Sequence, residues 1–358
     1  MKRSNTHKRN NPSNQEKQPA FVPQIDILKG LAIIAVILLH ALPVGFFLLI
    51  GSPYHIWQAV PLFILIAGFT SAYAYQRYGS KTLIECYNPY LLIRRFGRLL
   101  IPFFICWIIE LYLLFSVNKL PSDIVTLVTN LLEGGYGWGA FFIPVILQSV
   151  LVIPLIYLLA LRNPNRMVII VLFLTLLFDA VSMALGLSGN LSSIIYFRYM
   201  FAGALGVWIV MSPQINKHWL IIGGISSLVY ITIICYTSLL SSVPNFSGYD
   251  GILQAPAFMW TVILALTGLK YFPNKIDLSL YHYVGEIGKS SWHIFLAQLI
   301  YYMLPAAYVY AFIVTPLSFG NEILQNSLIV ILNLGICITF GYAWYAIEKR
   351  IHLMITKV

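Results

Sequence analysis

Residues 24–40 read QIDILKGLAIIAVILLH, and the apolar run that begins inside this stretch, near Leu28, continues to residue 50. Crossing the hydrocarbon layer of a membrane takes about 20 residues of α-helix at 1.5 Å rise each. The stretch therefore predicts a membrane-spanning helix that carries two ionisable residues, Lys29 near its start and His40 farther along. The run is too long for the hydrophobic part of a secretory signal, so we do not expect it to be cleaved.

The same apolar pattern recurs along the whole chain. Its 358 residues are 59% hydrophobic and only 9% charged, whereas about a quarter of the residues in a soluble domain are charged. This composition excludes a soluble globular enzyme and predicts an all-α integral membrane protein with about ten transmembrane helices. The predicted helices lie at residues 28–50, 55–75, 99–117, 139–160, 167–185, 194–212, 219–239, 252–271, 292–314 and 325–347.

The basic residues predict the orientation of these helices. If ten helices alternate, all of the 22 lysines and arginines except Lys119 and Arg198 fall on the side that holds both chain ends. Basic residues concentrate in cytoplasmic loops, so we expect the N- and C-termini in the cytoplasm. Because the net charge of +10 is spread over such loops, we expect contacts with membrane lipids and no nucleic-acid partner.

The domain organisation follows from the polar N-terminus. Residues 1–22 are basic and rich in Asn, Lys and Pro, so we expect a disordered cytoplasmic tail followed by one membrane domain over residues 23–358. The four cysteines are widely separated, with no pair or Cys/His cluster at metal-ligand spacing. We therefore expect neither disulfides nor a metal site.

Lys29 and His40 share one face of the first helix. They are 11 residues apart, which is about 1100° of helix rotation, or three turns plus roughly 20°, and roughly 16.5 Å along the axis. An ionisable group at that depth usually faces a cavity or the bundle interior. Two interpretations stay open: a functional pair, or a histidine bonded to a neighbouring helix with a lysine that extends to the lipid phosphates.

Arg95 and Arg98 precede the third predicted helix at a spacing that places both on one helical face. Guanidinium groups bind phosphate oxygens through two parallel hydrogen bonds, so the pair is a candidate clamp for an anionic substrate. The alternative, contact with anionic lipid headgroups, is the commoner use of basic residues at a membrane boundary. The spacing alone favours the lipid interpretation.

Four further polar residues fall within the predicted membrane helices. Charged and polar groups at this depth need partners or a polar cavity, and they indicate either an acceptor-binding site or plain contacts between helices. The structural interpretation is the more common one. The four are Glu110, Gln148, Asp179 and Arg198. The segment GGYGW at residues 134–138 joins flexible glycines to aromatic residues and is a further candidate for acceptor binding.

Three segments together resemble the acyltransferase 3 family of membrane acyltransferases. Residues 26–30 (DILKG) followed by His40 resemble its first motif, in which a basic residue precedes a histidine by the same interval. The pair Arg95 and Arg98 resembles its second basic motif, and residues 288–296 (GKSSWHIFL) resemble its G-x-x-S-Y-x-x-Y-L segment. The resemblance covers essentially the whole chain, including ten helices with both ends inside.

This resemblance implies a function and a set of roles. A membrane O-acyltransferase of this kind moves an acyl group, commonly acetyl, from cytoplasmic acyl-CoA to a hydroxyl of a cell-surface polysaccharide or its lipid-linked precursor. His40 is then the catalytic base or an acyl carrier, while Lys29, Arg95 and Arg98 bind the donor. Acetyl-CoA is a co-substrate, no cofactor is tightly bound, and the location is the plasma membrane of a bacterium. No appended soluble domain is expected.

Two residues depart from the family pattern. Lys29 stands where many members have arginine, so the charge is kept without bidentate phosphate binding. Gln298 stands where many members have histidine, and its amide forms hydrogen bonds but does not titrate. A transporter or flippase of a lipid-linked glycan is the alternative function, because a helical bundle with a few buried charges also describes carriers. The absence of paired halves in the sequence favours the enzyme.

Overall fold

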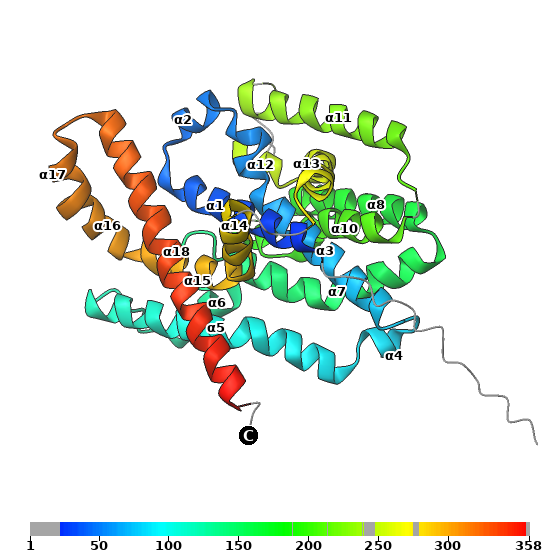
Figure 1. The fold of residues 1–358 in the computed structure, drawn as a ribbon, viewed down its shortest axis with the longest axis horizontal. Coiled ribbons are helices and arrows are strands. Elements are labelled where there is room, and N and C mark those ends of the chain that lie inside the picture. Colours follow the sequence, from blue (N-terminus) through cyan, green and yellow to red (C-terminus); the bar gives the residue numbers. More distant parts are fainter. Residues whose placement is uncertain are drawn as a thin grey trace, which may run out of the picture.

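The computed structural model describes residues 22–187, 189–212, 214–237, 239, 248–274 and 279–355, and these residues form helices without any strand (Figure 1). The all-α prediction is therefore confirmed over the described residues. The elements are α1 (Pro23–Ala41), α2 (Val44–Leu49), η1 (Ser52–Tyr54), η2 (Ile56–Gln58), α3 (Ala59–Arg77), α4 (Leu83–Cys86), α5 (Pro89–Ser116), α6 (Ile124–Glu133), α7 (Phe142–Arg162), α8 (Pro164–Ala184), α9 (Gly189–Ser193), η3 (Tyr196–Tyr199), α10 (Met200–Met211), α11 (Lys217–Tyr236), α12 (Gly248–Ile252), η4 (Ala255–Ala257), α13 (Phe258–Tyr271), α14 (Ser279–Lys289), α15 (Ser291–Met303), α16 (Pro305–Val309), η5 (Tyr310–Val314), α17 (Thr315–Ser318) and α18 (Glu322–Ile355).

The number of membrane-spanning helices differs from the expected ten. Seven described helices are long and apolar enough to cross a membrane, and an eighth is obtained if the bent pair α15 and α16–α17 counts as one span. The runs predicted at 194–212 and 252–271 form the shorter apolar helices Tyr196–Met211 and Ala255–Tyr271. At 1.5 Å per residue these reach only about 24 to 26 Å, less than a hydrocarbon layer of about 30 Å.

Proline sets both ends of α1. Pro23 occupies the first turn of the helix, where its missing N–H costs nothing. Leu42 adopts an extended conformation directly before Pro43, as expected for a residue that precedes proline. The apolar run predicted as one helix over 28–50 is therefore divided after Ala41, and His40 lies in the last turn of α1.

Close backbone contacts bring the central helices together. A side chain at Gly68 of α3 would collide with the backbone of Gly203 on α10, and a side chain at Gly288 of α14 would collide with Asp26 of α1. Small residues at such crossings allow helices to pack tightly where no hydrophobic effect drives their association. In Figure 1 these helices occupy the middle of the molecule, whereas α11, α5 and α18 lie around it.

The C-terminal helices extend away from the centre. The chain bends by 64° between α15 and α16–α17, and in Figure 1 α16, α17 and the adjoining end of α18 project from one side. A π-helical turn, η5, lies within the bent segment. The exposed surface of α18 carries large apolar side chains, including Ile331 and Phe340, as expected of a helix that faces lipid.

Two segments outside the predicted membrane helices were also considered in the sequence. The segment 118–138, which connects two of the predicted membrane helices, contains the helix α6, whose N-terminus is capped by Asp123 through backbone N–H groups of Val125 and Thr126. The predicted tail at residues 1–22 lies outside the described residues, apart from Val22, which precedes α1.

Candidate functional site

Helix α1 connects the two ends of the candidate site. It is α-helical from Pro23 to Ala41, so Lys29 and His40 lie on one face about 16.5 Å apart along the axis. On helix α5, Arg98 interacts electrostatically with Lys29, and Glu110 lies about 18 Å farther along the axis of that helix. We refer to the end with Lys29 as the basic end and to the opposite end as the histidine end.

Four cationic residues form a cluster at the basic end: Lys29, Arg94, Arg95 and Arg98. Lys29 forms an ion pair with Asp26 at 3.4 Å between Nζ and Oδ1. Arg98 is exposed and interacts electrostatically with Lys29 and with the other two arginines. Like charges this close repel one another, and an anionic ligand relieves that repulsion. The basic cluster thus has the charge expected of an anion site.

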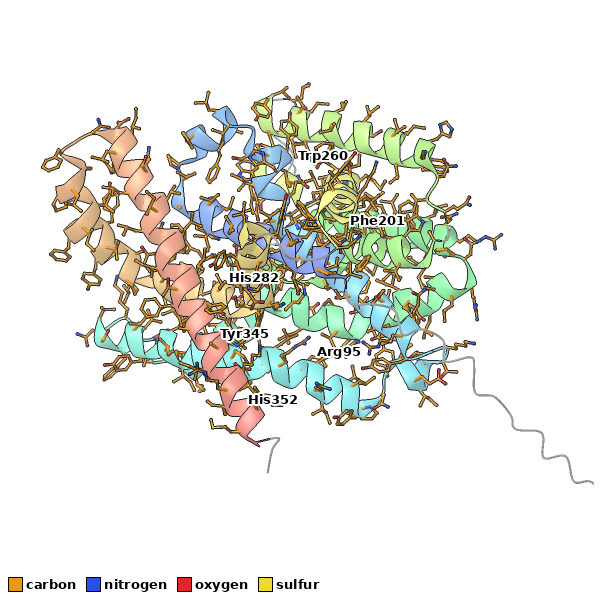
Figure 2. The ribbon with its side chains drawn as sticks, viewed as in Figure 1. Arg95, Phe201, Trp260, His282, Tyr345 and His352 are labelled. Atoms are coloured by element: carbon orange, nitrogen blue, oxygen red, sulfur yellow. The ribbon has the colours of Figure 1, made fainter. Side chains whose placement is uncertain are left out.

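Arg95 is fixed in place by an aromatic partner. Its Nη1 donates a hydrogen bond of 2.6 Å to the hydroxyl of Tyr75 on α3, and its guanidinium carbon lies 4.8 Å from the centre of the Tyr75 ring. Figure 2 shows Arg95 on α5 and Tyr345 on α18, and Tyr345 interacts electrostatically with Arg98. One arginine of the pair is therefore anchored while Arg98 remains exposed.

Sequence reasoning missed Lys289, the last residue of α14, as a member of this region. Its Nζ forms an ion pair of 2.7 Å with Glu286, and Asp26 and Tyr345 also interact with it. The hydrogen bond to Glu286 raises the pKa of Lys289, so this group stays charged. Its place in the GKSSW motif was the only signal in the sequence that pointed to it.

His40 is surrounded by aromatic residues and a glycine. Its ring lies 6.2 Å from that of Trp138 and 5.7 Å from that of Tyr302, measured between ring centres. A Cβ atom added to Gly139 would lie 3.4 Å from His40 Nε2, so the backbone passes directly beside the imidazole. Tyr302 is held by a hydrogen bond of 3.2 Å from its hydroxyl to the backbone oxygen of Ile37. His40 is half-buried.

The segment at residues 134–139, here called the glycine loop, forms one wall of the histidine end. Gly134, Gly135 and Gly139 have φ values of +99°, +109° and +90°, a region that side chains disfavour. Asn130 donates a hydrogen bond of 3.0 Å from Nδ2 to the oxygen of Gly135. A Cβ atom on Gly137 would lie 2.7 Å from Cβ of Leu299. The glycines thus allow the loop to lie against α15 and His40.

Glu110 connects α5 to this loop. Its side chain is fully buried, and its Oε2 accepts a hydrogen bond of 2.9 Å from the backbone N–H of Tyr136. A Cβ atom added to Gly135 would lie 2.5 Å from the same oxygen. In this geometry Glu110 supports the loop that contacts His40. This arrangement agrees with the interpretation of Glu110 as a contact between helices better than with a role in acceptor binding.

The other three polar residues predicted within membrane helices have partners that do not belong to the histidine end. Gln148 donates from Nε2 to the oxygen of Ile194 at 2.7 Å and accepts from the N–H of Tyr196 at 3.1 Å, so its amide holds the start of η3. Arg198 is buried and donates to the oxygen of Asp250 at 3.1 Å. Asp179 interacts electrostatically with Arg198, although its Oδ2 has no hydrogen-bond partner among the described residues.

A hollow of about 220 Å³ opens beside the glycine loop. It is smaller than the roughly 300 to 1,000 Å³ of sites for drug-sized ligands. Two of its lining residues carry a buried polar atom without a hydrogen-bond partner within the described ranges, the hydroxyl of Tyr136 and Oδ1 of Asn130. The lining residues are Val125, Thr126, Thr129, Asn130, Glu133 and Tyr136.

These features define a multi-pass helical membrane protein with a basic end and a histidine end joined by one helix. The model of the acyltransferase domain family, acyltransferase 3, matches residues 22–342. This match covers most of the chain, so the protein belongs to that family, as its motifs indicated. No curated protein and no solved structure matched the chain. Family membership implies a membrane acyltransferase and favours the enzyme over the carrier.

Proposed function

We propose that this protein transfers an acyl group, most simply acetyl, from acyl-CoA on the cytoplasmic side to a hydroxyl of an extracytoplasmic cell-surface polysaccharide or its lipid-linked precursor. The observation that carries the proposal is the position of His40. It lies half-buried beside the glycine loop, one helix length of about 16.5 Å from the basic cluster. A long donor with phosphates at one end and a thioester at the other matches this separation.

On the donor side, the basic cluster supports binding of the CoA phosphates. Arg98 is exposed and Arg95 is anchored by Tyr75, an arrangement that lets one guanidinium turn to a phosphate while the other stays in place. The ammonium group of Lys29 adds positive charge but does not form the two parallel hydrogen bonds of a guanidinium. The proposed orientation places this end in the cytoplasm, where acyl-CoA is found, consistent with the distribution of basic residues. A bacterial plasma membrane is the proposed location.

On the acceptor side, the glycine loop and its neighbours support entry of a glycan. Trp138 is 64% exposed and its ring lies 6.2 Å from that of His40, so it offers an apolar face beside the base. Tyr136, two residues earlier, lines the polar hollow at α6. Two extended residues span at most about 7 Å. The loop thus connects the hollow with Trp138 beside His40, a path that successive sugars of an oligomer would follow.

The proposed reaction is a direct transfer. The acceptor hydroxyl oxygen attacks the thioester carbonyl carbon as neutral His40 takes the hydroxyl proton. The C–O bond forms, the C–S bond breaks, and the proton passes from His40 to the departing thiolate of CoA. Transient attachment of the acyl group to His40 is the second route that the same residue allows.

The experiment that tests this function uses membranes that contain the full-length protein and their native glycan. Radiolabelled acetyl-CoA and succinyl-CoA are supplied in parallel, and label is measured in glycan and lipid-linked material. Membranes without the protein are the control. Label that depends on the protein supports the proposal. Failure of both donors, with added glycan and the protein present, would contradict it.

A further inference from the structure

The side chain of Gln298, on α15, has no hydrogen-bond partner among the described residues. None of it is exposed, and within that part of the chain both Nε2 and Oε1 lack hydrogen bonds. It is the only residue in the described ranges for which two buried side-chain atoms are unpartnered in this way. A buried amide without partners costs free energy, so such a group calls for a ligand or ordered water that pairs with it.

The neighbours of Gln298 along α15 show which way this amide faces. Residues 295, 298, 299 and 302 follow the i, i+3, i+4, i+7 pattern of one helical face. Phe295 and Leu299 lie against the glycine loop at Gly139 and Gly137, and Tyr302 contacts His40. Gln298 therefore lies on the face of α15 that is directed towards the histidine end.

The position of Gln298 along the axis of α15 also relates it to the two ends of the site. It precedes Tyr302 by one turn, about 6 Å along the axis. Near the start of α15, the ring of His293 lies 5.5 Å from that of Tyr345, the residue that interacts with Arg98 at the basic end. Gln298 thus lies between the basic cluster and His40, about one turn short of the imidazole.

We propose that the amide of Gln298 binds the cysteamine amide of the donor's pantetheine arm, an inference that rests on the proposed function. A secondary amide offers one N–H and one C=O, which complement the two unpartnered atoms of Gln298. In acyl-CoA this amide nitrogen is four covalent bonds from the thioester carbon, roughly 5 Å when extended. Pairing at Gln298 therefore places the thioester carbon about one helical turn farther on, beside His40.

The first test compares Gln298→Met with Gln148→Met in the purified full-length protein. Replacing an unpartnered amide with an apolar group of similar shape is neutral or stabilising, whereas removing a paired amide leaves its partners unsatisfied. We expect the thermal midpoint of Gln298→Met to equal or exceed that of the wild type, and that of Gln148→Met to fall. A loss in Gln298→Met like that in Gln148→Met would show a structural partner and overturn the inference.

The second test uses two small donors in the transfer assay. S-acetyl-N-acetylcysteamine contains the thioester and the cysteamine amide, whereas S-pentyl thioacetate has the same chain length without the amide. We expect the wild type to prefer the amide donor in kcat/KM by roughly tenfold or more, and Gln298→Met to lose this preference. The preference should persist in Gln148→Met, even though that variant is less stable.

The possible results distinguish the proposed role of Gln298 from the proposed acyltransferase function. Transfer by the wild type with the same donor preference in Gln298→Met would refute the role of Gln298 and leave the acyltransferase intact. Absence of transfer from acetyl-CoA, succinyl-CoA and both small donors in the wild type would refute the proposed function and this inference with it.

Discussion

Replacing Glu110 with leucine should release the glycine loop from its support beside His40. The carboxylate is fully buried and accepts the backbone N–H of Tyr136 at 2.9 Å. Leucine is similar in size but leaves this N–H without its acceptor. A buried donor left without a partner costs about 1 to 3 kcal/mol. At 1.4 kcal/mol per factor of ten, the loop equilibrium shifts by roughly 5- to 150-fold away from its present position.

The assay is label transfer at saturating acetyl-CoA, normalised to the amount of protein in the membrane. We expect Glu110→Leu to lower kcat by up to this factor, with the KM for acetyl-CoA unchanged, because Arg98 lies about 18 Å away along α5. Glu110→Gln keeps an acceptor oxygen and should recover most of kcat. Wild-type kcat in Glu110→Leu would refute the reasoning. A Gln variant as slow as the Leu variant would show that the charge, and not the positioning of the loop, is what matters.

Three further predictions concern the loop, the donor and the orientation. Gly139→Ala should reduce kcat by roughly tenfold, because alanine at a φ of +90° is strained by about 1 to 2 kcal/mol. Gly186→Ala, at a position that also has a positive φ, of +59°, but is open, is the control and should keep full activity. Arg98→Ala should raise the KM for acetyl-CoA by about tenfold or more with little change in kcat at saturation; an unchanged KM would favour lipid headgroups as the partner. A cysteine at Ser122 should react with an impermeant thiol reagent in intact cells, and one at exposed Tyr78 only after permeabilisation; the reverse would refute the orientation.

Local helical periodicity allowed part of this site to be predicted from the sequence. The 11-residue spacing of Lys29 and His40 requires only that α1 be one helix, and it is. The spacing of Arg95 and Arg98 likewise depends on α5 alone. Short-range geometry of this kind is independent of how the helices pack, so the candidate residues could be identified before the fold was known.

The contacts between segments that lie far apart in the sequence could not be predicted in the same way. Tyr136 follows Glu110 by 26 residues, and the contact between Tyr302 and His40 joins helices at opposite ends of the chain. No periodicity relates such pairs. The assignment of Gln148 as a support for η3 depends on the same kind of contact. The number of membrane-spanning helices was hard to predict for another reason. Hydropathy identifies apolar runs but does not distinguish a full span from a short or bent helix.

The central claim is that His40 carries out the transfer at the far end of the helix from the basic cluster. The most direct test measures transfer of label from radiolabelled acetyl-CoA into glycan by membranes with matched amounts of wild-type protein and His40→Ala. We predict label in the wild type and none above background in the variant. Transfer by His40→Ala at the wild-type rate would contradict the account.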